Sequence, residues 1–379
     1  MIKLREIFLI LCFIFIASSC NTTNKDKAMV IKSLFGKLSD GREVFKFTLK
    51  NKNGMEASII NFGATITSLI VPDKSGKMED VVLGYDSLEG FVNDKSYLGV
   101  IVGRYGNRIG KGKFSIDGKD FQVTVNDGEN HLHGGTIGFH KALWEAKAIE
   151  SDTAPAVELT YVSKDGEDGY PGTVTIKVTY TLTPDNELKI DYEGTTDKPT
   201  ILNPTNHAYF NLTGDPQNTI LDHQLQIESD STTPVVKGLI TTGAFASVAN
   251  TPFDFRTPTA IGARINDNNE QMEFGGGYDH NWVLKNYDGK VRKVAELYEP
   301  KSGRLLIYMT DQPGLQFYSG NFLDGSIKGK KGISYQYRTG LCLEAQHYPD
   351  SPNKPQWPSV VLRPGETYKQ TTIYKFSTK

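Results

Sequence analysis

Apolar and polar residues alternate with a period of two along many segments of this chain, and this pattern limits the fold more than any other feature. The segments 43–49, 121–125, 173–182 and 188–192 all show it. Such alternation is typical of strands that have one face on a core and the other toward water. The sequence has no long stretch with the 3.6-residue period of an amphipathic helix.

Turn signals such as Asp117-Gly118, Asp127-Gly128, Pro184-Asp185-Asn186 and Asp288-Gly289 separate the alternating segments. With 37 glycines and 17 prolines, the composition also disfavours a helical architecture. We find no internal repeat, low-complexity block or interdomain linker after residue 28. The sequence therefore predicts an all-β fold, a single large antiparallel β-sandwich domain over residues 28–379.

Charge and composition narrow the class of ligand. The net charge is −2, and hydrophobic and charged residues make up 38% and 23% of the chain, as in ordinary globular proteins. A nucleic-acid partner is disfavoured because phosphate binding needs a clustered basic surface. A small neutral ligand fits this composition better.

The N-terminus has the pattern of an export signal. Lys3 and Arg5 precede an apolar run over residues 7–16, which is too short to span a bilayer, and Ala17-Ser18-Ser19-Cys20 follows. This segment resembles a bacterial lipobox. The resemblance implies a lipoprotein signal peptide over residues 1–19, lipidation of Cys20, a flexible tether over 20–27, and a lipid anchor in the cell envelope that faces the periplasm. The alternative is an ordinary cleaved signal peptide with an incidental Cys20.

The three cysteines leave only one thiol in the predicted domain. Cys12 lies in the signal segment and Cys20 at the predicted anchor, so Cys342 has no intrachain disulfide partner. Cys342 stands in an apolar run beside Glu344, which predicts a buried and inert thiol.

Four polar clusters interrupt apolar, strand-like runs: NHLHGG at 130–135, TNHAYFNL at 205–212, GGGYDHNW at 275–282 and LCLEAQHYPD at 341–350. Their distance in sequence predicts a site assembled from several segments. His207 can donate a proton near neutral pH, or it can simply bond a backbone carbonyl. Glu344 lies between apolar neighbours, as either a paired structural charge or a catalytic base.

Three further motifs have competing interpretations. Asp279 follows three glycines that allow close backbone approach to a ligand, although an Asp there can also cap its own turn. His131 and His133 would share one face of a strand, but no third ligand is close in sequence, so we predict no metal. The segment 103–110 looks like a phosphate loop but lacks the Lys-Ser/Thr ending and the helix, which disfavours a nucleotide.

From about Phe35 to the C-terminus, the chain resembles the aldose 1-epimerase, or galactose mutarotase, family. The resemblance is carried, in order, by GRYGNRI, NHLHGG, DGYPG, NPTNHAYFNL, GGGYDHNW, LQFYSGNF and LCLEAQHYPDSPN. It implies a galactose mutarotase-like β-sandwich with a sugar cleft on one face. It also implies an isomerase that interconverts the anomers of free aldohexoses such as galactose and glucose, as a monomer and without a cofactor.

The resemblance also assigns roles to individual residues. His207 is the expected general acid and Glu344 the expected general base. The expected contacts to sugar hydroxyls are Asn107, Arg108, His133, Tyr209, Asp279 and Gln316. An ionised Glu344 beside a protonated His207 should raise the imidazole pKa and lower the carboxyl pKa, so that both groups hold these forms near neutrality.

Three other functions remain open from the sequence. A glycoside hydrolase would need two carboxylates across the bond, and Glu344 with Asp279 is the only pair that we can nominate. A sugar-binding module would use the same cleft without turnover. An epimerase of phosphorylated hexoses would need more basic residues, and the predicted envelope location disfavours it.

Overall fold

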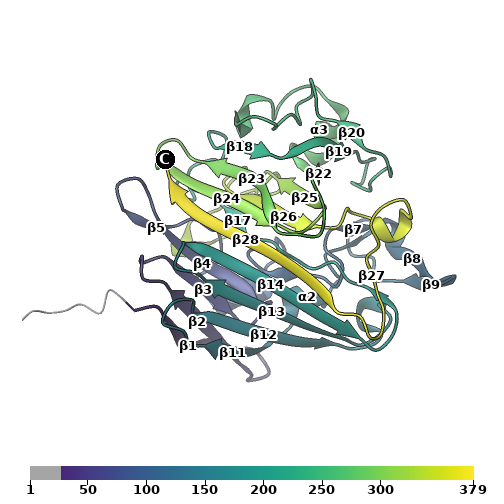
Figure 1. The fold of residues 1–379 in the computed structure, drawn as a ribbon, viewed down its shortest axis with the longest axis horizontal. Coiled ribbons are helices and arrows are strands. Elements are labelled where there is room, and N and C mark those ends of the chain that lie inside the picture. The colour runs from purple at the N-terminus through teal and green to yellow at the C-terminus, as the bar shows by residue number, and fades with distance from the viewer. Residues whose placement is uncertain (1–26) are drawn as a thin grey trace, which may run out of the picture.

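Three large antiparallel sheets make up most of residues 27–379, the part of the chain that the computed structural model describes (Figure 1). The predicted signal peptide and Cys20, the predicted lipidation site, lie outside these residues. The nine-stranded sheet has the order β11 (Glu145–Ile149), β12 (Ala156–Ser163), β13 (Val174–Leu182), β14 (Glu187–Thr196), β28 (Tyr368–Thr378), β24 (Arg304–Thr310), β23 (Arg292–Tyr298), β18 (Gln224–Ile227) and β21 (Thr259–Ala260).

The two other large sheets have five and six strands. The five-stranded sheet runs β1 (Met29–Lys37), β2 (Glu43–Lys50), β3 (Glu56–Ile60), β4 (Thr65–Pro72) and β5 (Met78–Asp80). The six-stranded sheet has the order β17 (Tyr209–Phe210), β26 (Leu341–Gln346), β25 (Gly314–Tyr318), β22 (Asp279–Leu284), β19 (Ser229–Thr233) and β20 (Ala246–Ser247).

Short strand pairs and helices complete the described part of the chain. The pairs are β6 (Ile101–Val102) with β16 (Thr205–Asn206), β7 (Arg108–Ile109) with β10 (His131–Leu132), β8 (Lys113–Ile116) with β9 (Lys119–Gln122), and β15 (Thr200–Ile201) with β27 (Val361–Leu362). The α-helices are α1 (Leu88–Asn93), α2 (Gly138–Lys141) and α3 (Glu270–Gly275), and the 3-10 helices are η1 (Gly110–Gly112), η2 (Glu167–Gly169), η3 (Ile261–Ala263), η4 (Lys330–Gly332) and η5 (Ser351–Asn353). Among residues 27–379, no helix is both long and apolar enough to cross a membrane.

The period-two segments become strands, as predicted. In β13 every second residue from Val174 to Leu182 is buried, and the residues between them are exposed or half-buried. This strand pairs with β14 across the turn at Pro184-Asp185-Asn186. The segment 121–125 is an exception, because β9 ends at Gln122 and the chain then bonds to Gly112 and Asp168 outside any strand. The predicted all-β class is confirmed.

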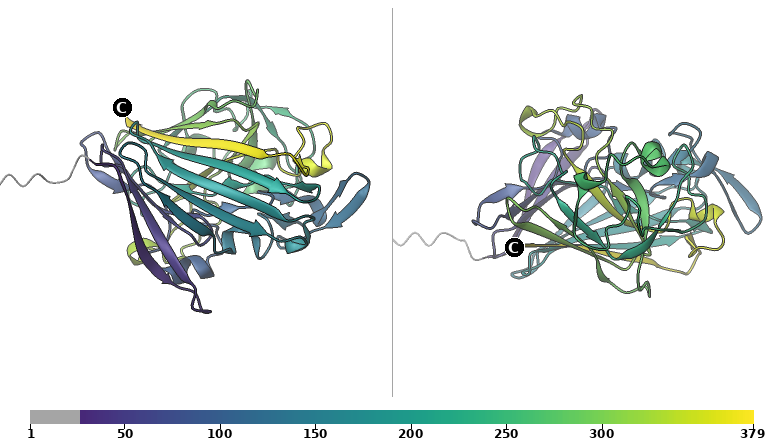
Figure 2. Two further views of the ribbon diagram at one scale, coloured as in Figure 1. Left: turned by 60° about the horizontal axis from the view of Figure 1, so that its bottom comes forward. Right: turned by 90° about the horizontal axis from the view of Figure 1, so that it is seen from above.

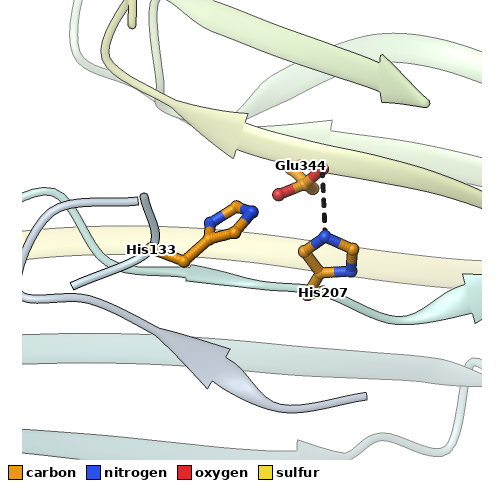
Figure 3. A group of neighbouring side chains, drawn as sticks. All are labelled: His133, His207 and Glu344. Atoms are coloured by element: carbon orange, nitrogen blue, oxygen red, sulfur yellow. Dashed lines mark ion pairs between the residues drawn. The ribbon is translucent and has the colours of Figure 1, made fainter. Parts of the chain in front are cut away.

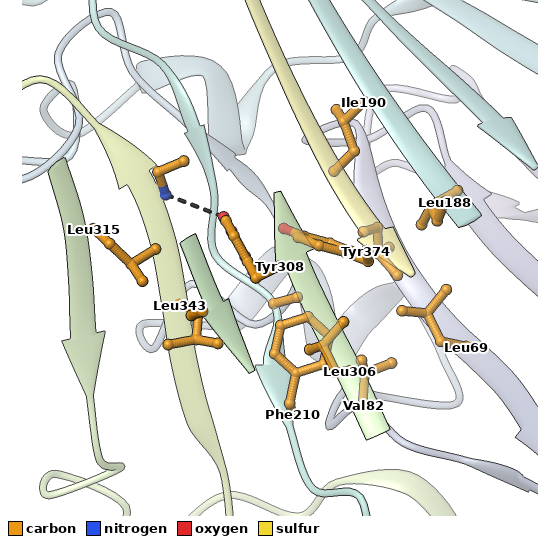
Figure 4. Close-up of a cluster of buried hydrophobic side chains, with 14 of the residues drawn as sticks. Leu69, Val82, Leu188, Ile190, Phe210, Leu306, Tyr308, Leu315, Leu343 and Tyr374 are labelled. Carbon is orange, nitrogen blue, oxygen red and sulfur yellow. Dashed lines mark hydrogen bonds between the residues drawn. The ribbon is translucent and has the colours of Figure 1, made fainter. Parts of the chain in front are cut away.

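One hydrophobic core joins the three large sheets and makes them a sandwich, as predicted. It includes Leu69 of β4, Leu306 of β24 and Leu343 of β26, each fully buried. Figure 4 shows these side chains converging from the different sheets, with Tyr308 of β24 among them. The Tyr308 hydroxyl accepts a hydrogen bond of 3.1 Å from the backbone N–H of Ala345, which ties β24 to β26 across the core.

The five-stranded sheet lies at a steep angle to the strands of the nine-stranded sheet (Figure 2). The six-stranded sheet buries Leu315, Phe317 and Leu343 in the shared core. Because side chains alternate across a strand, its opposite face is available for a polar site.

Candidate active site

A cavity of about 300 Å³ opens on the face of the six-stranded sheet that points away from the core. This volume is at the lower end of the range of roughly 300–1,000 Å³ that is typical of small-molecule sites. Its lining residues are Lys95, Ser96, Tyr97, Asn107, Arg108, Asp127, Leu132, His133, His207, Tyr209, Asp279, Tyr318, Phe322, Leu323 and Glu344. Segments more than 200 residues apart in sequence meet here, as the polar clusters predicted.

Strand β26 places Glu344 in this cavity through simple alternation. Leu341, Leu343 and Ala345 point into the hydrophobic core, so Glu344 must point to the opposite face. The pairing of β25 with β26 sets Gln316 directly opposite Glu344. On the next strand, Asp279 of β22 lies opposite Tyr318 of β25, and on the other side Tyr209 of β17 lies opposite Cys342.

The facing wall comes from the pairing of β7 with β10. Leu132 lies opposite Arg108, and the His133 backbone N–H donates to the carbonyl of Asn107 at 3.1 Å. Asn107 and His133 both have left-handed backbones, with φ of 61° and 52°. Asn and His adopt this conformation more readily than most residues, and here it turns both side chains toward the cavity.

His207 lies between β16 and β17 and is fixed through its backbone. Its N–H donates to the carbonyl of Val100, and its own carbonyl accepts from the N–H of Gly99, both at 2.9 Å. Its Nε2 lies 3.8 Å from Oε1 of Glu344. Figure 3 shows that His133, His207 and Glu344 point toward one another from separate segments. An imidazole and a carboxyl at this separation can act on two neighbouring oxygens of one ligand.

Burial, rather than mutual attraction, controls the protonation of this pair. Desolvation lowers the pKa of His207 to about 4 and raises the pKa of Glu344 well above its usual range. Asp279 raises the Glu344 pKa further, whereas Arg108 lowers it. Among residues 27–379, Oε2 of Glu344 has no hydrogen-bond partner that would favour the carboxylate. The expected raised imidazole pKa and lowered carboxyl pKa are therefore wrong, because loss of hydration outweighs a contact of 3.8 Å.

Arg108 and Asp279 are held by partners that leave polar atoms toward the cavity. The Nε of Arg108 donates to Oδ2 of Asp127 at 2.7 Å, while the structure gives its two terminal nitrogens no partner among the described residues. Oδ1 of Asp279 accepts from Nε2 of Gln316 at 2.7 Å. Desolvation raises the pKa of Asp279, although Arg108 and Gln316 oppose the shift.

Seven of the eight residues that the sequence singled out for catalysis or sugar contact line the cavity: Asn107, Arg108, His133, His207, Tyr209, Asp279 and Glu344. Gln316 does not line it, and lies behind Asp279 as its hydrogen-bond donor. The Tyr209 hydroxyl donates its proton to the carbonyl of Ser96 at 2.9 Å, so it has no second proton to donate to a sugar. The roles assigned to these residues stay predictions.

The paired histidines of the NHLHGG motif separate in the structure. The Nδ1 of His131 lies 2.6 Å from the carbonyl of Thr124, and its other nitrogen faces the Tyr170 hydroxyl. His133 instead forms a group with His207 and Glu344, in which one ligand atom from each lies within 4.8 Å of the others. This group of three side chains, whose spacing would suit a metal ion, therefore contains the predicted acid–base pair of His207 and Glu344. The sequence could not reveal it because the third member is 211 positions beyond His133.

Sequence reasoning missed several lining residues. Tyr97 carries no recognisable motif, and Asp127 was interpreted only as a turn residue. Tyr318 and Phe322 belong to the LQFYSGNF segment, where only Gln316 was singled out. The one available signal was period two in β25, which puts Tyr318 on the same face as Gln316. The buried position predicted for Cys342 is confirmed.

Comparisons with known proteins agree with this architecture and with the motifs. The family model described as aldose 1-epimerase matches residues 46–375. The galactose mutarotase of Bos taurus is 45% identical to this chain over 92% of its length and 98% of the relative's. The aldose 1-epimerase of Escherichia coli is 38% identical over 89% of this chain and 96% of the relative's. The structure of a galactose 1-epimerase from Lactobacillus acidophilus superposes with a TM-score of 0.81 at 30% identity, covering 92% of this chain and 98% of that one.

The family match covers most of the chain, and relatives of 38% and 45% identity are spanned almost completely. The solved structure covers a similar share of the chain, 92%. The chain therefore belongs to the aldose 1-epimerase family.

Proposed function

We propose that this protein is an aldose 1-epimerase that interconverts the α and β anomers of free aldohexoses such as galactose and glucose. The observation that carries the proposal is the buried pair of His207 and Glu344, 3.8 Å apart in a cavity lined by hydrogen-bonding side chains. Relatives named galactose mutarotase and aldose 1-epimerase support it.

Ring opening needs one proton removed and one proton added. Glu344 as carboxylate takes the proton of the C1 hydroxyl, and His207 as imidazolium protonates the ring oxygen as the C1–O5 bond breaks. The product is the open-chain aldehyde, with Glu344 neutral and His207 neutral. After a half-turn about the C1–C2 bond, the O5 hydroxyl adds to the other face of the carbonyl. His207 then takes back the O5 proton and Glu344 returns its proton to O1.

At neutral pH these pKa shifts make the pair of neutral Glu344 and neutral His207 the main form, so ring opening starts from its minor tautomer, in which Glu344 is the carboxylate and His207 the imidazolium. A carboxylate that is poorly solvated is a stronger base than in water, and an imidazolium with a pKa near 4 is a stronger acid. From that tautomer both transfers gain driving force, because they return the buried pair to its neutral form. The two groups share one exchangeable proton, so the apparent pKa values in a rate profile belong to the pair rather than to either residue.

The remaining lining residues bind and polarise the sugar. Nδ1 of His133 accepts from the backbone N–H of Asn107 at 3.2 Å, which fixes its ring proton on Nε2 when the ring is neutral. Desolvation lowers the pKa of His133 well below its usual value, so this neutral donor form dominates. Arg108 supplies charged donors to oxygens that gain negative charge, and Asp279 accepts from sugar hydroxyls.

Polarimetry of freshly dissolved α-D-galactose and α-D-glucose tests the proposed function. The purified full-length protein should accelerate the approach to anomeric equilibrium over buffer, and its Glu344→Gln variant should not. Release of a free sugar from a disaccharide would instead favour a glycoside hydrolase. Binding of hexoses without acceleration would favour a sugar-binding module.

Replacing Arg108 by alanine should lower kcat/KM about tenfold to a hundredfold, mainly through KM, because a charge-assisted contact to the substrate is lost. Arg108 also lowers the pKa of Glu344, so its removal raises that pKa. The mechanism needs one proton on the pair of His207 and Glu344. On the alkaline side, kcat/KM falls as the pair loses this proton.

This alkaline fall in kcat/KM should therefore move to higher pH in Arg108→Ala, as measured by polarimetry across the pH range. An unchanged alkaline fall and an unchanged kcat/KM would contradict the placement of Arg108 beside the pair.

We also propose that the protein is tethered to the cell envelope by a lipid on Cys20 and faces the periplasm, on the basis of the lipobox-like segment before this cysteine. The anchor would be its only membrane contact. Cys20→Ala should move the protein from the membrane fraction to the soluble fraction, as followed by immunoblotting, with Cys342→Ala as the matched control. Continued sedimentation of Cys20→Ala with membranes would refute the lipid tether.

We propose a monomer as the working unit, which is the state that the resemblance to the family implies. Light scattering on the purified protein should give a mass near that of one chain.

A further inference from the structure

Several hydrogen bonds fix the loop after α1 on one wall of the cavity. The carboxylate of Asp94 accepts from the backbone N–H of Ser96 at 3.0 Å and of Leu98 at 2.8 Å, and from the Tyr85 hydroxyl at 2.8 Å. The carbonyl of Ser96 accepts from the Tyr209 hydroxyl. These bonds hold residues 94–98 in one conformation.

Tyr97 lies at the centre of this loop with a φ of 61°. A left-handed backbone is a genuine outlier for a bulky residue and costs on the order of 1 kcal/mol or more. The surrounding bonds maintain that conformation, and its result is that the Tyr97 side chain lines the cavity. Strained backbone conformations of this kind cluster at active sites and ligand-binding clefts.

The ring of Tyr97 packs against three imidazoles. Its centroid lies 4.7 Å from that of His133, 4.9 Å from that of His140 and 5.9 Å from that of His207. His207 has Tyr209 as a second aromatic neighbour, at 5.1 Å. The interplanar angles of the His207 ring to the rings of Tyr97 and Tyr209 are 34° and 33°, so both tyrosine rings are in contact range of the imidazole.

The hydroxyls of the two tyrosines beside His207 differ: that of Tyr209 donates to the carbonyl of Ser96. Within residues 27–379, the structure gives the Tyr97 hydroxyl no hydrogen-bond partner, and the side chain is half-buried at the cavity wall. Desolvation, with a smaller contribution from Asp127, raises its pKa to about 12. The phenol therefore keeps its proton at neutral pH and can both donate to and accept from a ligand hydroxyl.

We propose that Tyr97 is a further substrate-contacting residue, whose hydroxyl bonds a hydroxyl of the bound sugar and whose ring limits the tilt of His207. This inference rests on the proposed function, because the ligand is the aldose of that reaction. It gives Tyr97 two separable contributions: the hydroxyl acts in sugar binding, and the ring positions the general acid.

Tyr97→Phe removes only the hydroxyl and should raise KM for the preferred aldose about fivefold, the effect of one neutral hydrogen bond, with kcat kept within about twofold. Tyr97→Leu removes the ring as well and should also lower kcat. Tyr287→Phe is the matched control, since Tyr287 is exposed on a loop outside the cavity. It should leave both constants unchanged.

Deoxy sugars identify the partner hydroxyl. The ratio of kcat/KM between the parent protein and Tyr97→Phe should fall to about one for the deoxy analogue that lacks the bonded hydroxyl and stay near five for the others, as in a double-mutant cycle. We would compare the 2-deoxy, 3-deoxy, 4-deoxy and 6-deoxy forms. A ratio of one for every sugar would overturn the hydroxyl contact.

Calorimetric binding of galactose keeps this test independent of turnover. If the parent protein does not accelerate anomer exchange, the proposed function fails. Weaker galactose binding by Tyr97→Phe than by the parent would then still support the contact, whereas equal binding would refute it. If the parent is active and Tyr97→Phe matches it in KM, kcat and binding, only the inference about Tyr97 fails.

Discussion

Replacement of Glu344 by glutamine is expected to lower kcat about 10³-fold to 10⁴-fold, the largest loss for any single change in this protein. The amide has the shape of the carboxyl group but cannot take the C1 hydroxyl proton. KM should change little because Glu344 acts on a proton that moves only in the transition state. Polarimetry with α-D-galactose, fitted for kcat and KM, measures both constants.

The fold should survive this change. Glu344 is buried, and its raised pKa means that the folded state binds its proton more tightly than the unfolded chain. Such a group stabilises the fold below its unfolded pKa, and that contribution is lost as the pH rises through the folded pKa. A neutral glutamine has no such loss, so the melting temperature at pH 7 should not fall. Glu158→Gln, at a partly exposed position on β12, is the matched control and should keep full activity. Near-normal turnover by Glu344→Gln would remove Glu344 as the base.

Period two in the sequence predicted where most of the fold would form. The segments that became β13 and β14 have one apolar face each, and local alternation is enough to place that face on a core. The same rule placed Glu344 opposite the core, because Leu343 and Ala345 flank it. The order of the strands in the sheets could not be predicted from the sequence. Pairing such as that of β14 with the C-terminal β28 depends on contacts between segments that are far apart in the chain.

The residues that escaped prediction share a physical reason. Tyr97 faces the cavity through a left-handed backbone held by Asp94, and neither propensity nor periodicity signals that conformation. The protonation of His207 and Glu344 was predicted in the wrong direction because a resemblance between sequence motifs says nothing about depth of burial. Desolvation is a property of the packed molecule, and here it outweighs a contact of 3.8 Å.

His207→Asn is the second large effect, with an expected loss of about 10²-fold to 10³-fold in kcat and little change in KM. Asparagine can still bond a ring oxygen weakly, but it cannot deliver a proton to O5. His347→Asn is the matched control, because His347 is a half-buried histidine that lies outside the cavity. Polarimetry of both variants with α-D-galactose checks the assignment, and near-normal activity of His207→Asn would refute it.

The pH profile adds a test that loss of packing would not mimic. In the parent protein, activity should fall as the pH drops through about 4, because His207 then takes up a second proton while Glu344 still holds its own and no base remains. The His207→Asn variant has no imidazole to titrate, so this acidic limb should disappear. Its residual kcat/KM should instead rise with pH toward the pKa of Glu344, since the carboxylate is the only acid–base group left in the pair. A residual profile that kept the fall near pH 4 would show that another group controls it, and that His207 does not carry the exchanged proton.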